Sequence, residues 1–170
     1  MTQLIHTAMQ SKFVKSCFVI IILFVIIFNP VSARIYTLFA AVFHDLDPGY
    51  FFEQIKAESS FRSLAFSREG AIGLGQVMPA TCKYISPRTH PSLLWFPPVN
   101  VNVSAKYTKH LLKKYQDNWS LTLASYNWGE TNVDKRIGNL EIARDKNYIS
   151  FFKDIPETYH FVGKIVKEQE

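Results

Sequence analysis

Apolar residues recur along most of this chain with the period of an α-helix. Residues 35–43 form one strongly apolar segment, and Asp47-Pro48 follows it. That pair is typical of a helix start, because the aspartate side chain caps the first turn and proline fits the first helical position. In the helix that follows, Phe51, Ile55 and Glu58 share one face, so Glu58 is expected to end an apolar stripe.

Further helices are predicted on either side of a glycine-rich loop and a proline-rich segment. The loop covers residues 62–75, and the proline-rich segment covers residues 87–98. The remaining helices are expected at residues 76–85, at 100–115 with its lysines outward, at 121–126, and from residue 156 onward. No stretch alternates between apolar and polar residues as a half-buried strand does, so the fold is expected to be all-α, or nearly so.

The first 33 residues have the pattern of a secretory signal peptide. Lys12 and Lys15 precede an apolar run at residues 17–28, and small residues lead to Ala33. We therefore expect export across the inner membrane with cleavage after Ala33, a catalytic domain at residues 34–170, and a location in the periplasm or cell envelope. The apolar run is shorter than the roughly 20 residues of a membrane-spanning helix. The alternative is an uncleaved anchor to the inner membrane through residues 16–28.

The composition narrows the classes of partner. The chain has 170 residues, 48% of them hydrophobic, which is enough for one domain with a core. Its formal net charge is +5, and the part after residue 33 carries +3, because the leader holds two lysines and no acidic residue. A mildly basic exported protein suits an anionic surface such as a cell wall or lipid headgroups, and without a basic stripe no nucleic-acid partner is expected.

Neither a disulfide nor a cofactor is expected in the domain. Cys82 is the only cysteine after residue 33, and we expect it to pack as a small apolar side chain in a helix. The four histidines after residue 33 have no ligand spacing with one another, so no metal site is predicted. They are His44, His90, His110 and His160.

Glu58 and the loop that follows it carry the candidate chemistry. A carboxyl group at the edge of an apolar wall is partly desolvated, which raises its pKa and keeps a proton available near neutral pH. The glycine-rich loop lets backbone approach closely. This combination suits a general acid acting on a sugar bond.

Five motifs in order then point to a family. The chain resembles the catalytic domain of soluble lytic transglycosylases, the SLT domain, a lysozyme-like fold related to goose-type lysozyme. The resemblance covers about residues 36–166. Its motifs are Leu46-Asp47-Pro48 with Glu58-Ser59 and Ser67, the run from Gly70 to Pro79, Asn100-Val101-Asn102 with Tyr107, Tyr126-Asn127-Trp128-Gly129, and Ile155-Pro156-Glu157-Thr158.

The resemblance implies an enzyme that cleaves the β-1,4 bond between N-acetylmuramic acid and N-acetylglucosamine in peptidoglycan. The product carries a 1,6-anhydro ring rather than a new hydroxyl from water. Glu58 would serve as the acid and then as the base, in a cleft beside its helix. Substrate-binding residues carried over by the same resemblance are Ser67, Gln76, Met78, Tyr126, Asn127 and Glu157.

Four positions depart from the family pattern, and one of them is Ser125, which stands where alanine is common. Gly75 stands where methionine is common, so we expect a more open cleft wall there. Trp128 replaces a small residue, and either fills a gap or adds a platform for a sugar. Phe161 stands where many relatives place a tyrosine hydroxyl near the catalytic acid.

Two other functions compete with this interpretation. A lysozyme-type hydrolase on the same fold needs a second carboxylate to activate water, and the candidates near the motifs are Glu69, Glu130 and Asp134. A non-catalytic protein would hold glycan strands for a secretion or conjugation machinery. The expected partners are peptidoglycan glycan strands, with such a cell-envelope machinery as a second partner, and the expected state is a monomer.

Overall fold

The computed structural model describes residues 2–167, and the side chains of residues 14–166. Met1 and residues 168–170, which belong to the predicted leader and catalytic domain, lie outside the described residues. The elements in chain order are α1 (Thr2–Phe28), α2 (Pro30–Phe43), α3 (Pro48–Ser59), α4 (Pro79–Ile85), the 3₁₀ helix η1 (Pro91–Trp95), α5 (Pro97–Lys114), α6 (Trp119–Trp128), α7 (Glu130–Ile137), the 3₁₀ helix η2 (Ile149–Phe152) and α8 (Pro156–Lys167).

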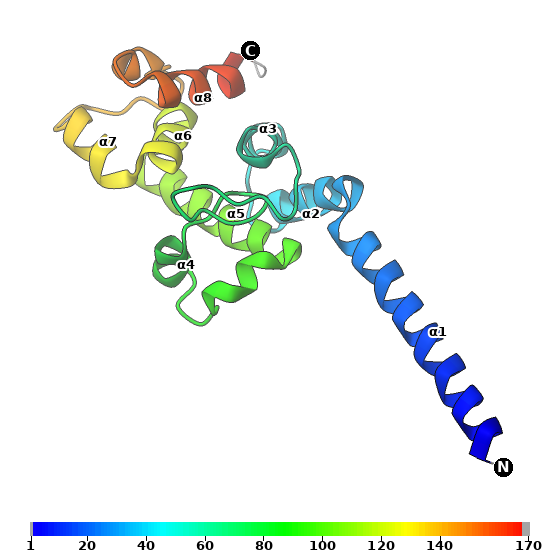
Figure 1. Cartoon of the computed structure of the whole chain (residues 1–170). Helices are drawn as coiled ribbons and strands as arrows, with labels where there is room; N and C mark the ends of the chain where they lie inside the picture. The colour runs from blue at the N-terminus through cyan, green and yellow to red at the C-terminus, as the bar shows by residue number, and fades with distance from the viewer. Residues whose placement is uncertain (1, 168–170) are drawn as a thin grey trace.

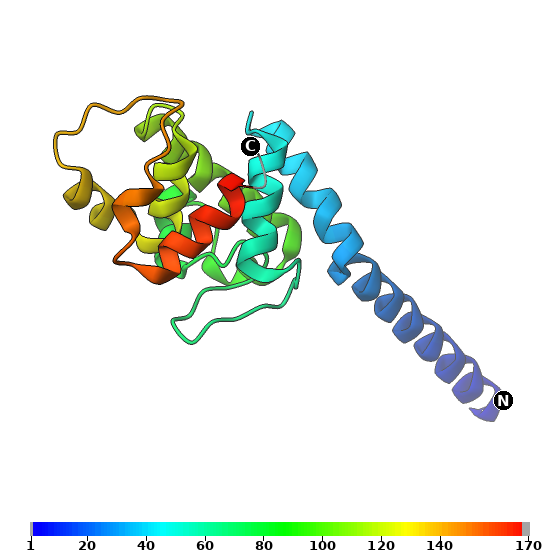
Figure 2. The same ribbon diagram turned by 90° about the horizontal axis from the view of Figure 1, so that it is seen from above.

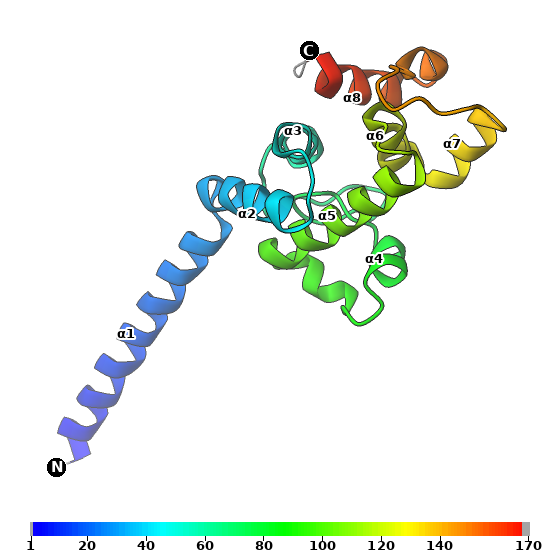
Figure 3. The same ribbon diagram turned by 180° about the vertical axis from the view of Figure 1, so that it is seen from behind.

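The prediction of an all-α fold is confirmed. Between residues 2 and 167 the chain forms helices and no strand, apart from isolated bridges that join Ile72 to Phe66 and to Val77. The helices α2 to α8 form the body of the molecule, and α1 projects away from it in all three views (Figures 1, 2 and 3). The predicted cleavage after Ala33 stays a prediction.

Local signals set the ends of α3 as expected. The Asp47 carboxylate accepts hydrogen bonds from the backbone amides of Gly49, at 2.9 Å, and Tyr50, at 3.1 Å, with Pro48 at the first helical position. After Ser59 the chain adopts left-handed backbone angles at Ser60 and Phe61, and this stops the helix. The glycine-rich loop therefore leaves directly from the end of α3 that carries Glu58.

Two apolar clusters hold the helices together. The first joins α2, α3 and α5 and includes the fully buried side chains of Phe51 and Ile55. The second joins α5, α6, η2 and α8, and it includes Leu121 and Ile165. Together they fix α3 between α2 and α8, as Figure 2 shows, so the position of Glu58 is set by core packing on both sides.

A third, smaller cluster supports the glycine-rich loop. It includes Val77, Leu94 and, as predicted, the buried side chain of Cys82 in α4. The helix expected from residue 76 begins only at Pro79, because Gln76 has a left-handed backbone, with φ of 46°. The helix α7 was not predicted from the sequence.

Candidate active site

Glu58 lies in the last turn of α3, on the face held by Phe51 and Ile55. Burial raises the pKa of its carboxyl group to about 8, and the negative charge of Glu157 adds to that rise. No side chain between residues 14 and 166 donates a hydrogen bond to this carboxyl group. An acid in this setting keeps its proton at neutral pH and has both oxygens free to meet a ligand.

A cleft of about 650 Å³ opens beside Glu58. It brings together three of the residues predicted from the sequence, namely Glu58, Ser67 and Gln76. The side chains of Arg62, Leu64, Ala65 and Phe66 line the same cleft and were not predicted. The sequence signal that could have indicated them is the presence of large apolar residues, Leu64 and Phe66, in a loop that is otherwise rich in polar residues and glycine. In the structure these two side chains are 51% and 63% exposed.

Ser67 and Gln76 also hold the loop in shape. The hydroxyl of Ser67 accepts hydrogen bonds from the backbone amides of Glu69 and Ala71, both at 3.2 Å. The side-chain amide of Gln76 donates to the carbonyl of Gly73 at 2.9 Å. Each of the two side chains therefore stabilises a turn and also lines the cleft. A role in the loop structure and a role in substrate binding are compatible for both residues.

Asn100, which belongs to one of the family motifs, has a structural role that the sequence did not reveal. Its amide is fully buried and donates to the carbonyls of Ile72, at 2.7 Å, and Leu94, at 2.9 Å. Its side-chain oxygen accepts a hydrogen bond from the amide of Gly75 at 2.8 Å. The absence of a Cβ at Gly73, with φ of 73°, leaves the room that this amide occupies. One side chain from α5 thus fixes the loop that forms the cleft.

The expectation of an open wall at Gly75 was wrong. Gly75 is buried, and a Cβ there would overlap the hydroxyl of Ser104 and come within 3.1 Å of the Tyr126 hydroxyl. The Tyr126 hydroxyl donates to the carbonyl of Gly75 at 2.7 Å. The pKa of Tyr126 lies well above its usual value, first through burial and then through the negative charge of Glu58. Gly75 therefore lets Tyr126 reach the loop backbone rather than widening the cleft.

Asn127 in α6 and Glu157 in α8 belong to two helices that contact each other. The side-chain oxygen of Asn127 accepts a hydrogen bond at 2.7 Å from the hydroxyl of Thr158, which is buried. Glu157 is exposed in the first turn of α8, and its charge acts on Glu58. Neither residue lines the cleft beside Glu58, and neither does Met78, which is 38% exposed before α4.

Trp128 and Phe161, the two aromatic residues that depart from the family pattern, pack against the second apolar cluster. The guanidinium of Arg136 lies 5.2 Å from the ring centre of Trp128, and Phe152 meets the same ring edge-on at 6.3 Å. These contacts support the interpretation of Trp128 as a gap filler. Phe161 is half-buried against the same cluster.

Comparison with protein-family models matches residues 36–149 to the Transglycosylase SLT domain. The chain belongs to this family. The SLT-domain chain is 27% identical over 130 residues to the soluble lytic murein transglycosylase of Salmonella typhimurium, covering 72% of this chain and 20% of that protein. It is 28% identical over 119 residues to the Escherichia coli K12 protein of the same name, covering 65% and 18%. The chain thus spans about a fifth of the length of these curated relatives.

Solved structures agree with the family in fold. An inactive mutant of a lytic transglycosylase from Pseudomonas aeruginosa matches the SLT-domain chain with a TM-score of 0.68 and 27% identity, over 84% of this chain and 24% of that one. A 70-kDa soluble lytic transglycosylase in complex with bulgecin A matches with a TM-score of 0.67 and 24% identity, over 77% and 22%. At that identity the second likeness shows the fold alone.

The carboxylates that a hydrolase would need lie elsewhere in this SLT-domain chain. Glu130 and Asp134 each pair with the Lys114 ammonium at 2.5 Å, and Glu69 is exposed in the loop. None of the three lines the cleft beside Glu58. Among the described residues, Glu157 is the carboxylate whose charge reaches Glu58.

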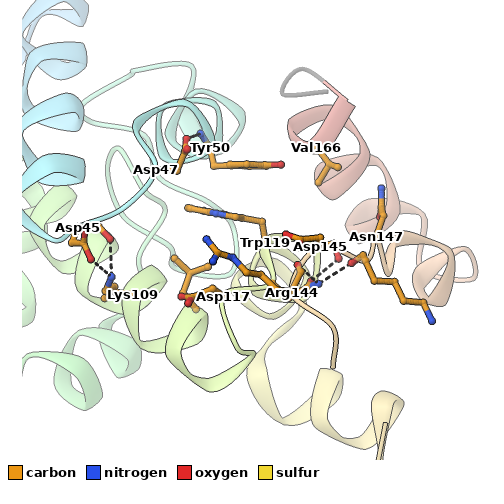
Figure 4. A pocket seen from close by; sticks show the side chains of 14 residues that line it. Asp45, Asp47, Tyr50, Lys109, Asp117, Trp119, Arg144, Asp145, Asn147 and Val166 are labelled. Carbon is orange, nitrogen blue, oxygen red and sulfur yellow. Dashed lines mark hydrogen bonds and ion pairs between the residues drawn. The ribbon is translucent and has the colours of Figure 1, made fainter. Parts of the chain in front are cut away.

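A second hollow, of about 570 Å³, lies at the opposite end of α3 (Figure 4). Charged side chains surround it, and among them Lys109 pairs with Asp45 at 2.9 Å. The rings of Tyr50 and Trp119 stack there with their centres 4.6 Å apart. The buried amide of Asn118 binds the loop at residues 143–146 through three carbonyls. None of the residues predicted for the active site lines this hollow.

Proposed function

We propose that this chain is a peptidoglycan lytic transglycosylase with Glu58 as its catalytic acid and base. The observation that carries the proposal is the desolvated carboxyl group of Glu58, with a pKa raised to about 8, in a cleft whose loop contains the SLT-family glycine motif. The substrate is the glycan strand of peptidoglycan, and the bond cleaved is the β-1,4 bond from N-acetylmuramic acid to N-acetylglucosamine. The names of the similar proteins support this substrate class.

In the first step the protonated Glu58 transfers its proton to the glycosidic oxygen. The bond from that oxygen to C1 breaks, the N-acetylglucosamine side leaves as an alcohol, and positive charge develops at C1. The acetamido group of the substrate itself stabilises this charge. A pKa near 8 suits the step, because most of the Glu58 carboxyl group is protonated at neutral pH.

In the second step the Glu58 carboxylate takes the proton from the C6 hydroxyl of the muramic residue. The C6 oxygen attacks C1 and closes the 1,6-anhydro ring, and Glu58 returns to its protonated form. No water enters the product, so one carboxyl group suffices where most glycosidases use two. The absence of Glu69, Glu130 and Asp134 from the lining of the cleft supports this route over hydrolysis.

The remaining site residues either bind the glycan or hold the elements that surround the cleft. Ser67 and Gln76 offer neutral hydrogen-bonding groups to hydroxyl and acetamido groups from the cleft wall. Met78 adds an apolar contact beyond the loop, and Tyr126 holds the loop at Gly75. Asn127 positions the start of α8 through Thr158, and Glu157 there keeps the Glu58 proton in place.

We infer that the enzyme acts outside the inner membrane, in the periplasm or cell envelope, where peptidoglycan lies. The signal-like pattern of residues 1–33 supports export.

The experiment that tests this function is mass spectrometry of purified peptidoglycan after digestion by the wild type and by Glu58→Gln. We expect 1,6-anhydro-muropeptides from the wild type alone. Reducing muramic ends that carry oxygen from solvent water would instead establish a hydrolase. Binding without release by both proteins would establish a glycan-holding role.

A further inference from the structure

The helix α2 is apolar on two opposite faces. Its inner face packs Ala33, Thr37, Ala40 and Ala41 into the first apolar cluster and against α3 and α5. A second row recurs at helical spacing on the outer face, which we call the α2 stripe, and its side chains are 45% to 82% exposed. The α2 stripe consists of Val31, Ile35, Leu38, Phe39, Val42 and Phe43.

The α2 stripe continues directly into α1. The apolar side chains of α1 from Phe18 to Ile26 are 42% to 64% exposed, on all sides of the helix. Figures 1 and 3 show α1 standing free of the body. An isolated helical segment that is apolar all round, as residues 17–28 of α1 are, is more stable in lipid than in water, because exposing apolar surface to water is unfavourable.

The junction between α1 and α2 is a defined structure. The Asn29 amide donates to the carbonyls of Val25, at 3.0 Å, and Ile26, at 2.6 Å, while its oxygen caps α2 at the amides of Val31 and Ser32. The Ser32 hydroxyl also donates to Ile26, at 2.6 Å. These bonds satisfy the backbone groups at the end of one helix and the start of the next, so the two helices are fixed as one bent unit.

Among the described residues no single helix has the length and hydropathy expected of a membrane span, whereas Val14–Phe28 and Pro30–Phe43 together do, with a bend of 54° between them. A signal sequence would pass the same test, so the geometry matters more than the hydropathy. A tilt of roughly 36° for α1, within the range seen for helices in membranes, brings α2 parallel to the bilayer surface. A helix with one apolar face lies in that interfacial plane.

The packing of Ala33 indicates that this unit belongs to the folded protein. Ala33 is fully buried in the first apolar cluster, and the guanidinium of Arg34 lies 5.4 Å from the ring centre of Phe61. Cleavage after Ala33 would divide α2 inside its first turns, remove a core residue and delete the Asn29 cap. The folded domain therefore uses the segment that the predicted processing would discard.

We propose that α1 is retained, that it embeds in the lipid bilayer, and that the α2 stripe lies in the interfacial layer of the same membrane. The bilayer is the occupant, because α1 and the α2 stripe form one continuous apolar surface. The domain is then seated on the membrane through a fixed face, and its cleft cuts glycan strands within reach of that surface. This proposal is independent of the catalytic role of Glu58.

The test uses the full chain in vesicles of phosphatidylcholine and phosphatidylglycerol, with and without bromine on the lipid acyl chains. Phe39→Trp places a fluorescent probe on the α2 stripe without changing the kind of side chain. Thr131→Trp is the matched control, because Thr131 is exposed on α7, far from α1 in every view (Figures 1, 2 and 3). Emission of the wild type, with its native tryptophans, is subtracted from both.

We expect brominated lipid to quench the added emission of Phe39→Trp by about half or more and to leave that of Thr131→Trp nearly unchanged. Equal, weak quenching of both variants would overturn the proposal. Blue-shifted but unquenched emission from Phe39→Trp would also overturn it, because a second copy of the chain would then cover the α2 stripe. In the intact-mass spectrum of the protein from cells, a chain that retains residues 2–33 supports the proposal and a chain that begins at Arg34 refutes it.

Discussion

The two ends of α3 place carboxyl groups in opposite environments. At its N-terminus Asp47 caps the helix, and the ammonium of Lys109 beside Asp45 holds the pKa of that neighbouring carboxyl below its usual value. At its C-terminus Glu58 has no cationic partner among the described side chains, and burial raises its pKa to about 8. The same kind of group is therefore a fixed anion at one end and a proton donor at the other.

The backbone of α3 adds to this difference. The N-terminus of a helix favours negative charge, and the C-terminus disfavours it. Asp47 gains from this field, whereas an ionised Glu58 in the last turn would oppose it. The pKa of Asp45 is lowered and that of Glu58 is raised, and such a divergence is typical of a site where one carboxyl group must keep a proton, so the cleft end of α3 is the end suited to acid catalysis.

The largest effect expected at either end is on activity. Glu58→Gln should lower the rate of anhydro-muropeptide release about 1,000-fold, because it removes the group that gives and takes the proton. Asp45→Asn makes the same change of carboxylate to amide at the other end, and should leave the rate within about twofold, since Asp45 does not line the cleft. Initial rates on purified peptidoglycan measure both. Similar losses in the two variants would contradict the assignment of the active end.

The next largest effect is expected on the free energy of unfolding, when Asn100, which holds the loop beside the cleft, is replaced. Asn100→Ala should lower the free energy of unfolding by about 3 kcal/mol, because the amide of Gly75 and two carbonyls lose their buried partner. Asn132→Ala is the matched control, since Asn132 is exposed and makes one hydrogen bond, to the Trp128 carbonyl at 2.8 Å. It should cost about 0.5 kcal/mol. Urea denaturation of the three proteins separates these outcomes, and equal costs would contradict a structural role for Asn100.

Local signals made one end of α3 predictable from the sequence. The start at Asp47-Pro48 depends on neighbours in the chain, and so does the start of α8 at Pro156, and both agree with the structure. The burial of Phe51 and Ile55 followed from their helical spacing. The helix α7 escaped prediction because it is short: Val133 and Ile137, four residues apart, are its only apolar residues, and two positions are too few to indicate a helical period.

The cleft end depends on contacts between distant residues, which the sequence does not display. The left-handed backbone of Gln76 is stabilised by the bridge between Ile72 and Val77 and by Asn100 on α5, so the start of α4 was placed too early. The role of Gly75 was misjudged because Ser104 and Tyr126 reach it from α5 and α6. Ser67 and Gln76 were found through the family motif, whereas Glu58 was indicated both by that motif and by its helical spacing from Phe51 and Ile55.

The stability of the protein should depend on pH through Glu58. Its pKa is about 8 in the folded chain against 4.5 for an ordinary glutamate, so its stabilising contribution is complete below about 4.5 and is lost as the pH rises to about 8. Glu58→Gln, which cannot ionise, should therefore be close to the wild type in stability at pH 4.5 and exceed it by several kcal/mol at pH 8 to 9. Urea denaturation at these two values measures the difference. A constant difference across that range would mean that Glu58 ionises freely.

A smaller effect is expected where Tyr126 binds the loop. Tyr126→Phe keeps the ring and removes the hydroxyl that donates to the Gly75 carbonyl, so the loop loses one fixed contact beside Glu58. We expect about a tenfold fall in kcat, with the free energy of unfolding lowered by about 1 kcal/mol. Tyr159→Phe is the matched control, because Tyr159 is a half-buried tyrosine on α8 that does not line the cleft. Steady-state kinetics on isolated glycan strands compares them, and an equal fall in both variants would remove Tyr126 from the site.

The smallest effect is expected at the other end of α3, and its sign distinguishes the two ends. Because Lys109 lowers the pKa of Asp45 in the folded chain, the pair stabilises the fold above the ordinary aspartate pKa, and this is lost as the pH falls through the lowered value. The pair is exposed, so Asp45→Asn should shift the thermal midpoint at pH 7 less than any variant above. Melting curves of Asp45→Asn and the wild type should converge toward pH 2, whereas those of Glu58→Gln and the wild type should diverge toward pH 9. If the melting curves of Asp45→Asn and the wild type diverged at alkaline pH instead, Asp45 would titrate in the same direction as Glu58. The proposed difference between the carboxyl groups at the two ends of α3 would then be wrong.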